Sequence, residues 1–169
     1  HFPVNIMEIF KKKRWNESSY VSSFVWMRDL QSLGGNSSRK YARNLIYTFI
    51  SSYRKTRKFW QNEDSWGYGI VGERIINWIL SYSFFASGSS DKFQREVLSS
   101  INEQFSHLLK CYKAELNPYS RLMALKAILF CFCVMKTNQK RQIKRKISEI
   151  CGVVQRCVQD GMFESRSPL

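Results

Sequence analysis

Apolar residues recur at steps of three and four along most of this chain, and that spacing places them on one face of an α-helix. The alternation of apolar and polar residues that would indicate β-strands is not found. Short polar turns separate the periodic segments, so successive helices are expected to form antiparallel hairpins. The sequence therefore predicts an all-α fold. It has about six helices, at residues 18–33, 36–53, 70–85, 90–114, 122–135 and 139–159.

Residues with known capping preferences mark several of the predicted helix ends. Gly34 and Gly35 supply the left-handed conformation that ends a helix, and Gly161 is expected to end the last one. Ser90 comes directly before an acidic first turn, and Asn117 comes directly before a proline. Both are therefore expected to be N-caps.

The helix predicted at 122–135 is apolar nearly all round. Lys126 and the adjacent Arg121 are its only charges, and its length of fourteen residues is too short for a bilayer, which takes about 20. We therefore predict a central buried helix and no transmembrane segment. Within it, the segment Ala127 to Val134 is expected to be the most buried part of the chain.

The helix predicted at 70–85 carries a polar stripe beside its apolar face. Arg74, Asn77 and Ser81 follow one another at i, i+3 and i+7. Such a stripe is either a solvent-facing surface or a cleft wall with donors for a ligand. Trp66 and Trp60 precede this helix on a polar segment, where they either stack on a sugar or a base, or cover the hydrophobic core.

Composition and charge narrow the class of protein. The chain has 169 residues, 44% of them hydrophobic, which is enough for one packed domain. Its 27 Lys and Arg against 13 Asp and Glu give a formal net charge of +14, which favours anionic partners such as nucleic acid, acidic polysaccharide or phospholipid headgroups. Residues 1–15 include a run of lysines and an arginine, so we expect a basic N-terminal arm followed by one domain at 16–169.

The five cysteines do not indicate a metal site or a disulfide framework. Their number is odd and they lack the paired spacing of a zinc site, so no metal and no cofactor is expected. We interpret them as buried thiols in a reducing, cytoplasmic compartment. The chain begins at His1, so a periplasmic location is expected instead if a leader was removed.

Five blocks of the sequence, taken in order, resemble the N-terminal α/α toroid of bacterial heparinase II/III-like proteins. They are Phe24–Leu30, Ser38–Ile46, the block from Trp66 through Arg74 to Trp78, Pro118–Leu125, and Asp160–Pro168. Five blocks in one order are more specific than any one of them. The resemblance implies an incomplete α/α toroid at 16–169, without the later toroid helices or the C-terminal β-sandwich of that family.

That family cleaves uronate-containing polysaccharides by β-elimination. The chemistry requires a group that neutralises the uronate carboxylate, a base for the C5 proton and an acid for the leaving oxygen. The resemblance therefore implies a carbon–oxygen lyase with an acidic polysaccharide as its partner. The implied substrate-binding residues, on or behind the cleft wall and on its rim, are Trp66, Arg74, Asn77, Trp78, Ser165 and Arg166.

The sequence also departs from the family pattern. Related sequences have Gly-His where Met162 and Phe163 stand here, so the expected toroid histidine is absent. His107 lies within a predicted helix with no partner pattern, which predicts a structural or surface role. No catalytic residue is therefore assigned, and this chain alone is expected to be inactive. The alternative is a basic helical domain that binds nucleic acid, or an interaction domain without catalysis.

Overall fold

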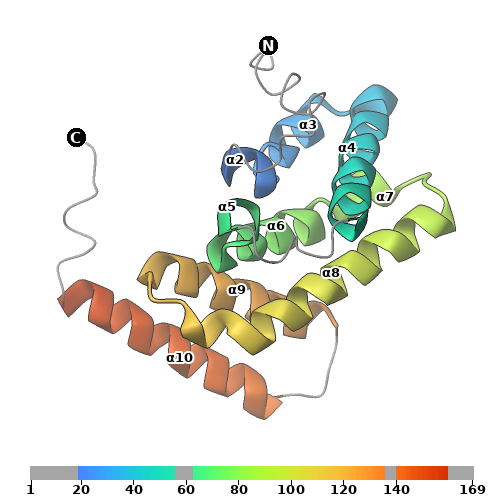
Figure 1. Ribbon diagram of the computed structural model, residues 1–169. Helices are drawn as coiled ribbons and strands as arrows, with labels where there is room; N and C mark the ends of the chain where they lie inside the picture. Colours follow the sequence, from blue (N-terminus) through green and yellow to red (C-terminus); the bar gives the residue numbers. More distant parts are fainter. Residues whose placement is uncertain (1–18, 56–62, 136–139, 160–169) are drawn as a thin grey trace.

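The computed structural model describes residues 19–55, 63–135 and 140–159, and every regular element within these ranges is a helix (Figure 1). The all-α prediction is thereby confirmed for the described part of the chain. The arm at 1–15 and the helix stop at Gly161 lie outside it. The elements are α2 (Ser19–Ser22), α3 (Met27–Leu33), α4 (Gly35–Lys55), α5 (Glu63–Trp66), α6 (Tyr68–Leu80), α7 (Tyr82–Ala86), α8 (Asp91–Cys111), the 3₁₀ helix η3 (Tyr112–Ala114), α9 (Pro118–Val134) and α10 (Lys140–Gln159).

Helix α6 is the centre of the arrangement. Figure 1 shows α2, α3 and α4 on one side of α6 and α9 and α10 on the other, with α8 crossing between the two groups. An aromatic cluster fills the space between α6 and the first group, with the Phe24 ring edge-on to Phe49 and Trp78 at centroid distances of 5.3 and 5.2 Å. Rings packed edge to face add about 0.5–1.5 kcal/mol each beyond the area that they bury.

The prediction that Ala127 to Val134 is the most buried segment is wrong. Val134 is 54% exposed and Cys133 is also exposed, whereas nearly every residue from Val71 to Trp78 on α6 is buried. The reason is the position of α9, which packs on α6, α8 and α10 but is left uncovered near its C-terminal end. An all-round apolar composition therefore did not identify the central helix.

Gly34, Ser90 and Asn117 cap helices as predicted. Gly34 and Gly35 have φ angles of 64° and 74°, in the left-handed region. The Ser90 hydroxyl accepts a hydrogen bond from the Phe93 N–H at 3.3 Å, and the Asn117 side chain accepts one from the Ser120 N–H at 3.1 Å. These bonds satisfy backbone donors that a helix start otherwise leaves unpaired.

Two of the predicted helices are interrupted. The helix expected at 18–33 is divided into α2 and α3 by a turn at residues 23–26, in which Phe24 has a left-handed φ of 58°. The helix expected at 70–85 is divided at Ser81 into α6 and α7. Periodicity alone misses both breaks, because apolar residues on each side of the break still point into the same core.

Helix α10 is rotated relative to the prediction. The apolar spacing of this segment predicts that Ile147, Cys151 and Val154 face inward, but all three are exposed, while Lys146 and Val153 are buried. Lys146 faces inward because its ammonium lies 4.0 Å from the centre of the Tyr112 ring and donates hydrogen bonds to the Tyr112 hydroxyl and the Glu149 carboxylate. A pattern that counts only apolar residues cannot anticipate a buried lysine.

Two glycines allow α9 to approach α6 closely. A Cβ atom on Gly72 would lie 2.7 Å from the Met123 carbonyl oxygen, and one on Gly69 would lie 3.0 Å from the Ser120 Cα. Side chains at these two positions would push the helices apart. The spacing of the two glycines in the sequence was therefore a packing signal that the hydrophobic pattern does not contain.

No helix within the described ranges is long and apolar enough to cross a membrane.

The substitution Gly72→Ala is expected to lower the free energy of unfolding by about 1–2 kcal/mol. Alanine favours a helix by about 1 kcal/mol over glycine, but the new methyl group would meet backbone atoms of α9 that cannot rotate away. The measurement is a denaturant titration. Gly152→Ala on α10 is the matched control, because its Cβ would meet only a flexible arginine side chain at 3.7 Å. The control should be neutral or stabilising, and equal effects at the two sites would contradict the packing argument.

The Tyr112–Lys146–Glu149 cluster predicts a pH-dependent attachment of α10. Burial alone would raise the pKa of Glu149, but hydrogen bonds from Tyr112 and Lys146 and the charges of Lys146 and Arg145 outweigh it and lower this pKa. The ionised Glu149 carboxylate therefore stabilises the fold fully at a pH above its unfolded-state pKa of about 4.5. This stabilisation is lost as the pH falls through the lower pKa of the folded state.

Glu149→Gln is therefore expected to cost about 1 kcal/mol at pH 7, because the carboxylate is partly exposed and its ion pairs are weakened by solvent. The difference between the two proteins should shrink below pH 4.5. Unfolding titrations at several pH values measure it. A difference that grows toward low pH would refute the assigned direction.

Candidate functional site

The break between α2 and α3 leaves backbone carbonyls that α6 supplies with donors. In an uninterrupted helix the Ser23 carbonyl would accept from the Met27 N–H, which here donates to the Phe24 carbonyl instead at 3.0 Å. The Asn77 amide donates to the Ser23 oxygen at 2.9 Å, and Arg74 Nη1 donates to the Ser22 oxygen at 2.8 Å. Side chains of α6 therefore fix the conformation of the turn.

Arg74 is completely buried and connects three parts of the core. Besides Ser22, it donates to the Ser65 carbonyl at 3.0 Å and to the Gln104 side-chain oxygen at 2.6 Å. Its guanidinium carbon lies 4.5 Å from the centre of the Phe49 ring and 4.8 Å from that of Trp66, so aromatic faces offset part of its lost hydration. Burial lowers the pKa of Arg74 to about 9, and the side chain therefore stays charged at neutral pH.

The polar stripe on α6 accordingly points inward, and the solvent-facing interpretation is wrong. Arg74, Asn77 and Ser81 are all buried. Trp66 and Trp78 also lie in the core, at 2% and 0% exposure. Trp66 therefore covers the hydrophobic core and is not available to stack on a ligand. Trp60, Ser165 and Arg166 lie outside the described residues, as does Phe163.

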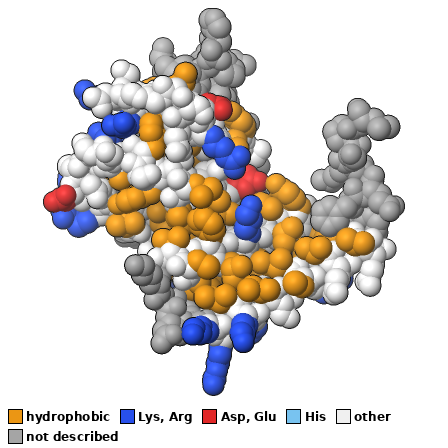
Figure 2. Space-filling view, turned by 180° about the vertical axis from the view of Figure 1, so that it is seen from behind, with side chains coloured by type: hydrophobic (Ala, Val, Ile, Leu, Met, Phe, Trp, Pro, Cys, Tyr) orange, Lys and Arg blue, Asp and Glu red, His pale blue; other side chains and the backbone are white. Residues whose placement is uncertain are grey.

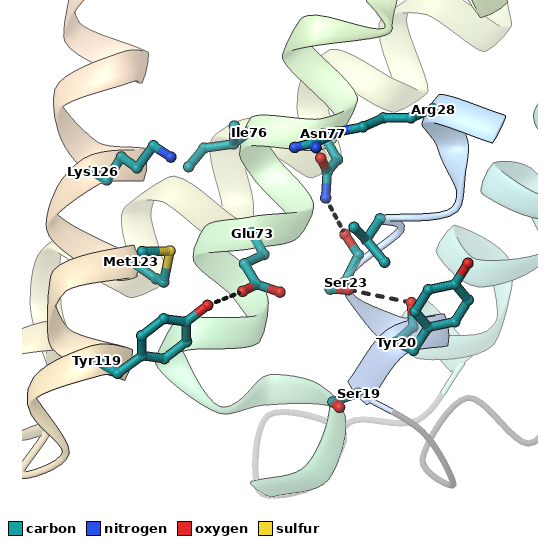
Figure 3. Close-up of a pocket in the computed structure, with 11 residues that line it drawn as sticks. Ser19, Tyr20, Ser23, Arg28, Glu73, Ile76, Asn77, Tyr119, Met123 and Lys126 are labelled. Carbon is teal, nitrogen blue, oxygen red and sulfur yellow. Dashed lines mark hydrogen bonds between the residues drawn. The ribbon is translucent and has the colours of Figure 1, made fainter. Parts of the chain in front are cut away.

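A polar pocket opens beside this buried network, between α2, α3, α6 and α9. Its volume is about 440 Å³, and Asn77 is the sequence-predicted site residue that lines it. Arg74 is buried in the core and does not line the pocket. The side chains around the pocket are those of Ser19, Tyr20, Ser23, Val25, Arg28, Glu73, Ile76, Asn77, Tyr119, Met123 and Lys126 (Figure 3).

Two cationic side chains enter the pocket from different helices. Figure 3 shows Arg28 of α3 and Lys126 of α9 reaching toward α6 from opposite sides, near Asn77 and Ile76 respectively. Arg28 and Lys126 are exposed and both line the pocket, so their charges lie at its solvent-accessible surface rather than in the core. An anionic group in the pocket would therefore be met by donors from two sides.

Glu73 and Tyr119 form a hydrogen-bonded pair at the same opening. The Tyr119 hydroxyl donates to Glu73 Oε1 at 2.9 Å, and Figure 3 shows this bond between α9 and α6. The bond to Glu73, together with burial and the carboxylate charge, raises the pKa of Tyr119. The phenol is therefore protonated at neutral pH, which suits it to donate a hydrogen bond rather than to accept a proton.

Sequence reasoning did not identify four of the residues that give the pocket its chemistry: Arg28, Glu73, Tyr119 and Lys126. Lys126 had a usable signal, because it is a single charge within an otherwise apolar helix. Glu73 lies beside Arg74, but it is 100° away around the helix and faces the pocket instead of the core. The pocket forms only when α3 and α9 pack on opposite sides of α6, and no local pattern contains that information.

The histidine and cysteines of the described chain do not form a metal site. His107 is half-buried against the rings of Trp66 and Tyr68, at centroid distances of 6.2 and 5.8 Å. Burial, with the charges of Arg74 and Lys110, lowers its pKa, so it is neutral at pH 7. Within the described ranges no group of three or more metal-ligating side chains is gathered, and Cys111, Cys131, Cys133, Cys151 and Cys157 are free thiols.

Arg74→Met is expected to lower the free energy of unfolding by about 2–4 kcal/mol, because two buried carbonyls would lose a charged donor. Arg28→Met is the control, since that arginine is exposed, and its effect should stay within about 0.5 kcal/mol. Denaturant titrations of the two variants measure the difference. A more stable Arg74→Met protein would mean that desolvation of the charge exceeds the gain from its hydrogen bonds.

Comparisons with protein-family models, with curated proteins and with solved structures find no match for this chain.

Proposed function

We propose that the polar pocket binds an acidic sugar unit of a uronate-containing polysaccharide. The observation that carries this proposal is the pair of cations, Arg28 and Lys126, in a pocket that also offers hydroxyl and amide groups. A uronate unit presents one carboxylate among several hydroxyls and therefore needs a few cationic donors beside neutral polar ones. The net charge of +14 would in addition attract a polyanion over a longer range.

Four side chains of the pocket have a role in this proposal. Arg28 and Lys126 meet the carboxylate, Glu73 accepts a bond from a sugar hydroxyl, and Tyr119 packs its ring against sugar C–H groups. Glu73 also favours a sugar over a nucleic-acid backbone, because a sugar unit offers several hydroxyl donors to a carboxylate, whereas a phosphodiester group offers none. Nucleic acid is therefore the second candidate.

We further propose that these helices form part of the α/α toroid of a heparinase II/III-like polysaccharide lyase. The succession of α8, α9 and α10, each packed on the next, supports a ring of helical hairpins. The pocket then contributes to the substrate cleft by binding and positioning. Tyr119 is protonated and donates its hydrogen bond to Glu73, and His107 does not line the pocket, so the chain by itself is expected to be inactive.

Removal of either pocket cation should weaken binding of uronate oligosaccharides by about tenfold, the equivalent of about 1.4 kcal/mol. The variants are Arg28→Met and Lys126→Met, titrated calorimetrically with a uronate oligosaccharide and with a neutral oligosaccharide of the same length. Lys110→Met is the matched control, because this exposed lysine of α8 removes the same charge away from the pocket.

The expected result is that wild-type protein prefers the uronate oligosaccharide and that only the two pocket variants lose this preference. Equal losses for Lys110→Met would show that net charge, and not the pocket, drives binding. Tight binding of single-stranded RNA with no binding of either oligosaccharide would favour the nucleic-acid alternative.

A further inference from the structure

A second surface, distinct from the polar pocket, lies on the outer face of α10. This helix packs on α9 through its inward face. Its outer face carries Ile147, Cys151, Val154 and Val158, and the three aliphatic side chains are exposed to 46%, 36% and 64%. Figure 2 shows a broad band of apolar side chains on the back of the molecule, with Lys and Arg side chains along its lower edge.

The exposed apolar residues of α10 have the spacing of a helix–helix contact. They follow one another at steps of four, three and four, which is the alternation of the two seam positions in a heptad. Continued toward the N-terminus, the same steps reach Lys144 and Lys140. We name these six residues the α10 seam. It is apolar over its C-terminal two thirds and basic over its first turn.

The basic end of the seam is not neutralised by α10 itself. Lys140 and Lys144 are exposed, and Arg141 and Arg145 follow them on the next face. Glu149 is the one carboxylate in the sequence of α10, and it is engaged by Lys146 at 3.2 Å and by Arg145 at 3.6 Å. A carboxylate from outside the helix would therefore meet uncompensated positive charge at Lys140 and Lys144.

Side-chain type and charge decide what covers the seam. An interfacial membrane helix relies on Trp, Phe and Leu to enter the lipid, whereas the seam has short and mostly β-branched side chains that suit close packing against another helix. A second copy of this chain would bring the same net charge of +14 toward the first. Both features favour a helix of opposite charge.

We infer that the α10 seam docks an amphipathic helix of a partner protein. That helix has apolar residues at heptad spacing and carboxylates at the end that faces Lys140 and Lys144. The mode is a helix laid along an apolar stripe, in which the apolar contacts supply affinity and the charges fix the orientation. No residue of the polar pocket belongs to the α10 seam, so docking at the seam does not depend on the proposed sugar binding. A further toroid helix packed on the same face would exclude the partner helix, so the seam docks a partner only where this face stays open.

The test uses the full chain and two synthetic helical probes of about three heptads. Both have leucines at the seam positions. One has glutamates at one end, and the other has lysines at the same places. Fluorescence anisotropy should show that the chain binds the glutamate probe at least about tenfold more tightly than the lysine probe. The double variant Lys140→Glu/Lys144→Glu should reverse this preference, and Val154→Glu should abolish binding of both probes.

The matched control is Lys92→Glu/Lys110→Glu on α8, which changes the net charge by the same amount at exposed positions away from the seam. It should alter binding of the glutamate probe by no more than about twofold. Circular dichroism of each variant shows that its helices are intact.

Five results would overturn the inference. Equal binding of the two probes would refute the role of charge in docking, and no binding of the glutamate probe would refute docking of an acidic helix. Loss of binding in the α8 control as large as in the α10 variant would reduce the effect to net charge. If the chain binds phosphatidylserine vesicles and Val154→Glu abolishes this binding, the seam is a membrane contact. If the chain dimerises in sedimentation experiments and Val154→Glu abolishes dimerisation, the seam binds a second copy.

Discussion

The buried guanidinium of Arg74 is the interaction on which the rest of the structure depends. It supplies donors to carbonyls from the broken first helix and from the segment before α6, and it holds Gln104 of α8 as well. Four separate segments are thus joined through one side chain. Because a buried cation is costly to desolvate, it persists only where its partners are in place, and this favours a single arrangement of the core.

The polar pocket follows from the same constraint. Asn77, one turn along α6 from Arg74, holds the Ser23 carbonyl, and this contact fixes the turn that leads into Arg28. On the other side, the close contact at Gly72 positions α9 and with it Lys126. The positions of the two cations thus have separate causes. The hydrogen bond from Asn77 to Ser23 places Arg28, and the close approach of α9 to α6 at Gly72 places Lys126.

Burial also separates the roles of residues that are neighbours in sequence. Glu73 and Arg74 are adjacent, yet one lines the pocket and the other lies in the core. The same separation occurs on α10, where Lys146 is buried against Tyr112 while Ile147 is exposed. In both helices a charged residue is taken inward by specific partners. The apolar face that remains outside on α10 becomes available for contact with another helix.

The sequence by itself determined the helical class, the caps and the buried face of α4, because helix periodicity and capping act over a few residues. Ala42, Leu45, Ile46, Phe49, Ile50 and Tyr53 are all buried as their spacing predicts. The resemblance also drew attention to Arg74 and Asn77, which the structure places at the centre of the core and in the pocket wall.

Only the tertiary structure decided which helix is central, where the first helix breaks and which charges line the pocket. Each of these depends on contacts between residues far apart in the chain. Arg74 and Ser22 are one example, and Gly72 and Met123 are another. The pattern of apolar residues identifies the faces that avoid water, but it does not say which buried polar groups meet. The balance between desolvation and hydrogen bonding in the assembled core makes that choice.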